Sequence, residues 1–158
     1  MGSATVLDLL NDHMSDIVEA GADLYVVAIG TNDVRYRDQE LCAMDPEAYV
    51  QRLSELRAQI LDSNSDAEFV FIAPWYSTDG DVVSKVLSYT EKLELYQGYA
   101  ASLEAWTSMN GDGFINANSY IQQTLDLYPH GDYMVDYVHP NATSGVELYC
   151  RAALLYPN

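Results

Sequence analysis

Two short polar sequences contain residue types that could perform acid–base chemistry: GTND at positions 30–33 and DYVHPN at positions 136–141. The imidazole of His139 can accept a proton near neutral pH, as a general base must. A carboxylate three residues upstream, Asp136, can fix the imidazole tautomer and stabilise its protonated form. The amide of Asn32 can donate a hydrogen bond to a developing oxyanion, an interaction commonly worth ~3 kcal/mol.

Each of these sequences also has a structural interpretation. GTND consists of residue types that favour turns, and a single histidine before a proline is often a surface residue. Asp136 is one of 24 acidic residues. The functional interpretation rests on the combination. GTND follows an apolar run, and DYVHPN precedes an expected helix.

This pair of motifs resembles the third block, G-x-N-D, and the fifth block, D-x-x-H, of the SGNH (GDSL-type) hydrolases. The resemblance implies that His139 is the general base, that Asp136 orients it, and that Asn32 belongs to the oxyanion hole. It also implies a three-layer α/β/α, flavodoxin-like fold with a parallel sheet. It covers nearly the whole chain, from the family's second block onward.

The chain departs from the family pattern at its start. Gly-Asp-Ser, which carries the nucleophilic serine in the first block, does not occur in the sequence. Met1-Gly2-Ser3 resembles the second block, which would make Gly2 a backbone donor to the oxyanion; alternatively, these residues are an expression scar. We therefore expect one SGNH-like domain over 1–158 that is N-terminally truncated and, as this chain alone, inactive for lack of the nucleophile.

Three apolar runs predict buried parallel strands, near 23–30, 67–74 and 114–118. Apolar residues at helical spacing predict helices over about 6–21, 46–63, 83–109, 119–127 and 141–155, with Asp45 as an N-cap. Alternating helices and strands indicate a doubly wound α/β fold. Because ligands bind beyond the carboxyl ends of parallel strands, we expect Asn32, Asp136 and His139 to meet there.

Two aromatic residues that follow the second strand, Trp75 and Tyr76, are candidates for lining a substrate pocket, although they could equally pack in the core. His13 and His130 show no H-x-x-x-H or H-E-x-x-H spacing, so we expect no metal site. Neither a G-x-G-x-x-G nor a Walker sequence is present, so we expect no nucleotide cofactor.

The net charge of −17 argues against nucleic acid and anionic membrane surfaces as partners. The sequence contains no apolar run long enough to span a membrane, and it does not distinguish a cytoplasmic from a secreted protein. The first strand is expected to have one bare edge, through which copies of the chain could associate.

We therefore expect an esterase or lipase-like hydrolase, or an acyl transferase, acting on short-chain acyl esters. Acetyl groups on carbohydrates are the favoured substrates. The alternative is a non-catalytic flavodoxin-like domain that binds a ligand or acts as a scaffold. The sequence leaves open the acyl group, the acceptor and the compartment.

Overall fold

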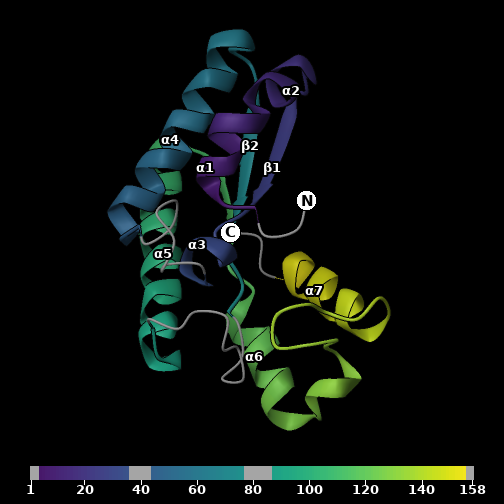
Figure 1. Cartoon of the computed structure of the whole chain (residues 1–158). Coiled ribbons are helices and arrows are strands. Elements are labelled where there is room, and N and C mark those ends of the chain that lie inside the picture. The colour runs from purple at the N-terminus through teal and green to yellow at the C-terminus, as the bar shows by residue number, and fades with distance from the viewer. Residues whose placement is uncertain (1–3, 36–43, 77–86, 156–158) are drawn as a thin grey trace.

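The computed structural model describes residues 4–35, 44–76 and 87–155. Helices and strands alternate along them (Figure 1). In chain order the elements are α1 (Val6–Asp8), a π-helical turn η1 (Leu9–His13), α2 (Met14–Glu19), β1 (Leu24–Ala28), α3 (Thr31–Arg35), α4 (Pro46–Ser63), β2 (Glu68–Ile72), α5 (Tyr89–Asn110), β3 (Gly113–Ile115), α6 (Asn118–Leu127), a 3₁₀ turn η2 (His130–Asp132) and α7 (Ser144–Leu155).

The three strands form one parallel sheet in the order β1-β2-β3. Leu24 pairs with Glu68 at the start of β1, and Val70 pairs with Gly113 at the start of the β2–β3 ladder. The prediction of three parallel strands with the middle one central is therefore confirmed. All three strands end on the same side of the sheet, which is where the loops of an α/β protein bind ligands.

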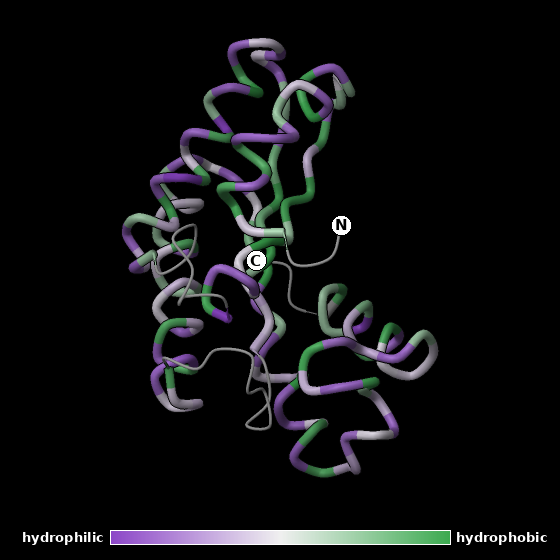
Figure 2. Tube along the Cα trace, in the orientation of Figure 1, coloured by the Kyte–Doolittle hydropathy of each residue, from purple (hydrophilic) through white to green (hydrophobic). Residues whose placement is uncertain are grey.

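One face of the sheet is covered by α4 and α5 (Figure 1). Phe69 and Phe71 of β2 are almost fully buried there, together with Tyr49 of α4 and Tyr99 of α5, whose rings stack at 4.1 Å. Figure 2 shows β1 and β2 as mostly hydrophobic, whereas α4 alternates between hydrophobic and hydrophilic residues. This pattern is what a buried parallel sheet under amphipathic helices requires.

The other face is covered at the carboxyl end of the sheet by α6 and α7. A cavity there is walled by Ala28 and Ile72 of the sheet, Ile121 of α6 and Tyr149 of α7. These two helices form a second core, which contains Ala117, Ile121, Leu125, Met134, Leu148 and Ala152. This second core supports the loop that contains His139.

Several boundaries differ from those expected. α5 begins at Tyr89, where Ser88 and Glu91 form a capping box, rather than near residue 83; residues 77–86 lie outside the described part of the chain. β3 ends at Ile115 because Asn118 already begins α6. GTND is not an isolated turn, since Thr31 begins the short helix α3. Asp45 caps α4 as expected, accepting a hydrogen bond from the Ala48 N–H at 2.8 Å.

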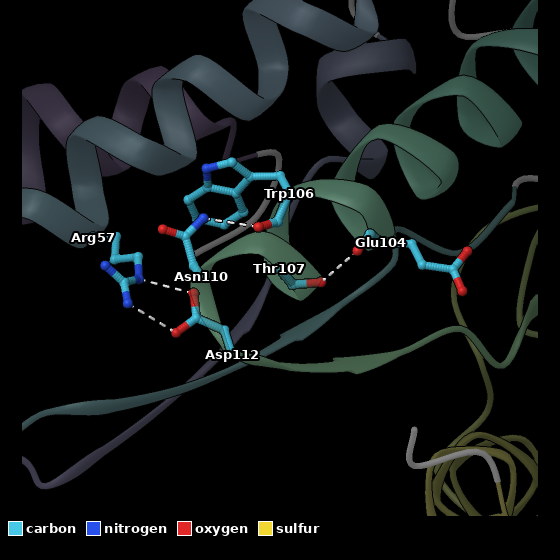
Figure 3. A network of polar contacts seen from close by, with 6 residues as sticks. All are labelled: Arg57, Glu104, Trp106, Thr107, Asn110 and Asp112. Carbon is cyan, nitrogen blue, oxygen red and sulfur yellow. Dashed lines mark hydrogen bonds and ion pairs between the residues drawn. The ribbon is translucent and has the colours of Figure 1, made fainter.

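The amino-terminal end of the sheet is closed by a charged contact (Figure 3). Arg57 of α4 donates two hydrogen bonds, at 2.8 and 3.0 Å, to the carboxylate of Asp112, which lies in the turn between α5 and β3. The guanidinium also lies 5.1 Å from the centre of the Phe69 ring. Because the Asp112 side chain is 6% exposed, this contact fixes the turn to α4 away from the candidate site.

The outer edge of β1 has no partner strand among the described residues. The N–H of Glu68 donates to Asp23, so the backbone groups of Leu24, Val26 and Ala28 point away from β2. The side chains of Leu24 and Val26 are 51% and 59% exposed. In the described part of the chain, no helix is long and apolar enough to cross a membrane.

Candidate active site

The first part of the site is the junction between β1 and α3. The hydroxyl of Tyr49 donates a hydrogen bond to the carbonyl of Ile29 at 2.9 Å, which places its ring against Gly30. Gly30 has φ +120°, and a Cβ atom there would lie 2.9 Å from the Tyr49 ring. Both conditions require glycine, so the glycine of GTND lets the chain turn sharply into α3.

Asn32 lies in the first turn of α3. Its Nδ2 donates a hydrogen bond to the carbonyl oxygen of Ala4 at 3.0 Å, and its Oδ1 accepts one from Arg35 at 3.4 Å. The hydroxyl of Thr31 donates to the carbonyl of Trp75, three residues beyond the end of β2, at 3.3 Å. The orientation of the Asn32 amide is therefore fixed by the segment before α1.

Asp33 is completely buried and accepts hydrogen bonds from the Val6 N–H at 3.1 and 3.3 Å. Burial raises the pKa of its carboxyl to about 7, against the lowering effect of hydrogen bonds from Val6 and from its own N–H; the charge of Asp8 adds to the increase. Its partner Val6 is 27 residues away in sequence, and this contact joins α1 to α3.

A cavity of about 220 Å³ opens at this end of the sheet, between the segment before α1 and the ends of β1 and β2. Asn32 and Trp75 line it together with Ala4, Ala28 and Ala73. Tyr76 points elsewhere: its ring stacks on Tyr96 of α5 at 5.5 Å. Of the two aromatic pocket candidates, Trp75 therefore borders this cavity, whereas Tyr76 packs against a helix.

The second part of the site is a tight hairpin in the loop between α6 and α7. Met134 and Pro140 form an antiparallel bridge, and the Val135 N–H donates to the His139 carbonyl at 2.8 Å. One carboxylate oxygen of Asp136 accepts hydrogen bonds from the backbone N–H groups of Val138 and His139, both at 2.8 Å. The hairpin thus holds the Asp136 carboxylate in one orientation.

The other oxygen of Asp136 lies 2.8 Å from Nδ1 of His139. Although burial acts to raise the pKa of Asp136, the hydrogen bonds from His139 and Val138 and the charge of the imidazole lower it to about 2. An ionised carboxylate at Nδ1 requires a proton on that nitrogen, so Nε2 carries the lone pair. The imidazole is 66% exposed and can therefore meet a substrate.

Asn141 and Gly145 hold the base of the hairpin against α7. The Asn141 side chain donates to the Asp132 carbonyl at 2.8 Å and accepts from the Gly145 N–H at 2.9 Å. A Cβ atom on Gly145 would lie 2.0 Å from the carbonyl oxygen of Tyr133. No motif in the sequence predicts the close approach at Gly145.

Trp75 connects the two parts of the site. Its indole contacts the ring of Tyr149 in α7 edge-on, with 4.9 Å between the ring centres. The adjacent loop is fixed by Asn118 of α6, which donates to the Pro74 carbonyl and accepts from the Tyr76 N–H. Asn32 and the helix behind the hairpin thus border the same end of the sheet. The direct approach of His139 to Asn32 stays a prediction.

Two further expectations concern Gly2 and metal ions. Gly2, the second oxyanion donor implied by the family resemblance, lies outside the described residues. Within the described ranges, His, Cys, Asp and Glu side chains form no group of three that could hold a metal ion.

No family profile and none of the curated proteins match the chain, but solved structures do. One is a protein from Parabacteroides merdae described as a GDSL-like lipase. It superposes with a TM-score of 0.76 at 17% identity, over 97% of this chain and 70% of the lipase chain. A variant of Axe2, an acetyl-xylooligosaccharide esterase from Geobacillus stearothermophilus, gives 0.69 at 20%, over 97% and 67%. The chain has the SGNH hydrolase fold. LAE5, an α/β hydrolase from the Lake Arreo metagenome, gives 0.70 at 20%, over 97% and 67%.

The solved variants of Axe2 allow a more specific comparison. Alanine variants described as catalytic mutants replace a serine, an aspartate and a histidine of that enzyme. Its aspartate and histidine are three positions apart, the same spacing as Asp136 and His139 here.

Proposed function

We propose that this chain carries the general base, the orienting acid and part of the oxyanion-binding region of an SGNH-type serine ester hydrolase or acyl transferase. The observation that carries this proposal is the contact of 2.8 Å between His139 Nδ1 and Asp136, whose carboxylate is held by two backbone N–H groups. This arrangement leaves Nε2 of an exposed imidazole as the proton acceptor.

In the proposed mechanism, His139 Nε2 takes the proton of a serine hydroxyl as its oxygen attacks the acyl carbon. The carbonyl oxygen becomes negatively charged and is stabilised by the amide of Asn32. When the ester C–O bond breaks, the protonated His139 returns the proton to the leaving alcohol. Water or a second alcohol then attacks the acyl-enzyme with the same help from His139, which gives hydrolysis or transfer.

The nucleophile is proposed to come from a strand that pairs with the outer edge of β1. Ser144, the described serine nearest to His139 in sequence, donates its hydroxyl to the Asp132 carbonyl and so holds the hairpin base. The exposed edge of β1 ends beside the cavity that Asn32 lines. A serine at the end of a strand paired there would face both the amide and the hairpin.

Short acyl groups, acetyl above all, are the proposed substrates, borne by small molecules or carbohydrates. The cavity beside Asn32 is small, and the side chains of Ala4, Ala28 and Ala73 leave room for a few heavy atoms. Support from the comparisons comes from Axe2, which is described as an acetyl-xylooligosaccharide esterase.

The test is active-site labelling with a fluorophosphonate. We expect no labelling of the 158-residue chain. Fusing the serine-bearing N-terminal unit of Axe2 ahead of residue 4 should produce labelling, which His139→Ala and replacement of the grafted serine by alanine should both abolish. Labelling of the unfused chain at Ser3 would contradict the proposed origin of the nucleophile.

A second measurement does not depend on the graft. In proton NMR spectra of the chain, the His139 Nδ1–H should give a downfield, exchange-protected signal, and Asp136→Asn should remove it. If the signal is absent and the folded fusion does not react, the non-catalytic binding or scaffold alternative is favoured.

A further inference from the structure

A further cavity, of about 320 Å³, lies between α6 and α7, outside the groups used by the proposed reaction. Its walls combine aromatic rings with hydroxyl and charged side chains. The residues that matter here are Tyr120, Tyr128, Tyr133, Ser144, Glu147 and Arg151.

The aromatic walls form an angle rather than a flat stack. The rings of Tyr128 and Tyr133 have centres 6.1 Å apart and planes inclined at 57°. Tyr128 is 54% exposed, so much of its ring surface is open to solvent. Inclined aromatic faces of this kind offer an apolar surface to the C–H face of a compact, non-planar ring.

The polar walls offer groups that suit hydroxyl partners. Both hydrogen bonds of Arg151 to Glu147 go to the same carboxylate oxygen, Oε1, at 2.9 and 2.5 Å. Among the described residues, the second oxygen of Glu147 and the Nη1 of Arg151 make no hydrogen bond. Ser144 donates its proton to the Asp132 carbonyl and accepts from the Asn141 side chain at 3.4 Å, which leaves its oxygen one further acceptor position. One ligand hydroxyl could thus donate to Glu147 while another accepts from Arg151.

We propose that this cavity binds one neutral sugar unit. A sugar ring combines an apolar C–H face with hydroxyl groups that donate and accept hydrogen bonds, which is the combination these walls complement. The net charge of −17 disfavours an anionic ligand. This inference deepens the proposed function and rests on it in one respect: the sugar would belong to the alcohol portion of the ester.

The cavity is joined to the catalytic hairpin through Tyr133. The carbonyl of Tyr133 accepts the backbone N–H of Asn141 at 2.8 Å, next to the Met134–Pro140 bridge. Asp136 and His139 lie between these bridged residues. A sugar resting on Tyr133 would therefore touch the base of the loop that carries the proton acceptor, and would position the ester relative to it.

The test is binding of unacylated cellotriose, xylotriose and maltotriose to the 158-residue chain, followed by NMR titration. Tyr128→Ala should weaken binding of the preferred trisaccharide by about tenfold, which corresponds to about 1.4 kcal/mol. Tyr128→Phe keeps the ring and should bind within about twofold of the wild type. Tyr137→Ala is the matched control, because Tyr137 is similarly exposed, at 52%, but lies outside the cavity.

The proposal is overturned if none of the three trisaccharides binds with a Kd of about 10 mM or lower. So would an equal loss of binding in Tyr128→Ala and Tyr137→Ala. The assay requires neither an ester nor a nucleophile, so it is independent of labelling. Binding that depends on Tyr128, found together with an absent His139 Nδ1–H signal and a folded fusion that does not react, would retain the sugar site and count against the hydrolase. Labelling of the fusion without sugar binding would retain the hydrolase and refute the sugar site.

Discussion

The backbone N–H of Val6 lies 3.1 and 3.3 Å from the two carboxylate oxygens of Asp33, which belongs to the same helical turn as Asn32. This contact and the bond from Asn32 to Ala4 attach the segment before α1 to the carboxyl end of the sheet. The position of the proposed oxyanion donor therefore depends on a buried carboxyl.

Asp33 should make the stability of the chain depend on pH. Because burial raises the pKa of Asp33 from 3.8 to about 7, the folded state holds this proton more tightly than the unfolded state. Its contribution to the free energy of unfolding should thus be largest below about pH 4 and fall as the pH rises to about 7.

Urea denaturation of Asp33→Asn and wild type across this pH range measures the contribution. The stability difference between the two proteins should change by up to about 1.4 kcal/mol per pH unit inside the window and level off above it. Asp66→Asn, which alters an exposed carboxyl, is the control and should retain the wild-type slope. An Asp33→Asn slope equal to that of wild type would refute the assignment.

Gly30 and Gly111 should respond differently to alanine. Both have positive φ, but a Cβ atom on Gly30 would meet the Tyr49 ring at 2.9 Å, whereas one on Gly111 meets nothing within 4 Å. Gly111→Ala should cost about 1 kcal/mol for the backbone alone. Gly30→Ala should cost at least about 2 kcal/mol, because overpacking adds to the backbone cost. Thermal unfolding of the two variants checks this order.

The parts of the fold that could be predicted from sequence are those with strong local signals. The uninterrupted apolar run before Gly30 identified β1, and Asp45 with Pro46 identified the start of α4. α3 was missed because Thr31, Asn32 and Asp33 favour turns as much as the start of a helix. Local preference does not distinguish the two; contacts with Val6 and Ala4 do.

The candidate site divides in the same way. The contact between Asp136 and His139 is local, three residues apart, and the resemblance of DYVHPN to the family's D-x-x-H block implied it. The partners of Asn32 and Trp75 are 28 and 44 residues away in sequence, and no spacing rule specifies them. The tyrosines around the cavity between α6 and α7 follow no motif, and only the pairing of these two helices brings them together.

The contact between Arg57 and Asp112 should stabilise the fold without affecting the site. Asp112→Ala leaves a half-buried guanidinium without its partner and should lower the free energy of unfolding by about 2 to 3 kcal/mol. The exposed pair of Arg52 and Glu55 is the control, and Glu55→Ala should cost less than about 1 kcal/mol. Similar losses in both variants, measured by urea denaturation, would contradict this prediction.

The open edge of β1 should make this chain associate. The backbone groups of Leu24, Val26 and Ala28 face outward, and the exposed side chains of Leu24 and Val26 leave an apolar surface beside them. Val26→Pro removes the central outward N–H. It breaks no bond to β2, because this N–H faces away from β2, and proline is tolerated at such edge positions.

Light scattering at increasing protein concentration should show association of the wild type and a monomeric Val26→Pro variant. Leu154→Lys is the control, because it replaces a 79% exposed side chain of α7 rather than of β1 and should associate like the wild type. Association that survives Val26→Pro but is lost in Leu154→Lys would place the contact on α7, and the edge of β1 would then no longer be the expected docking position for the serine-bearing strand.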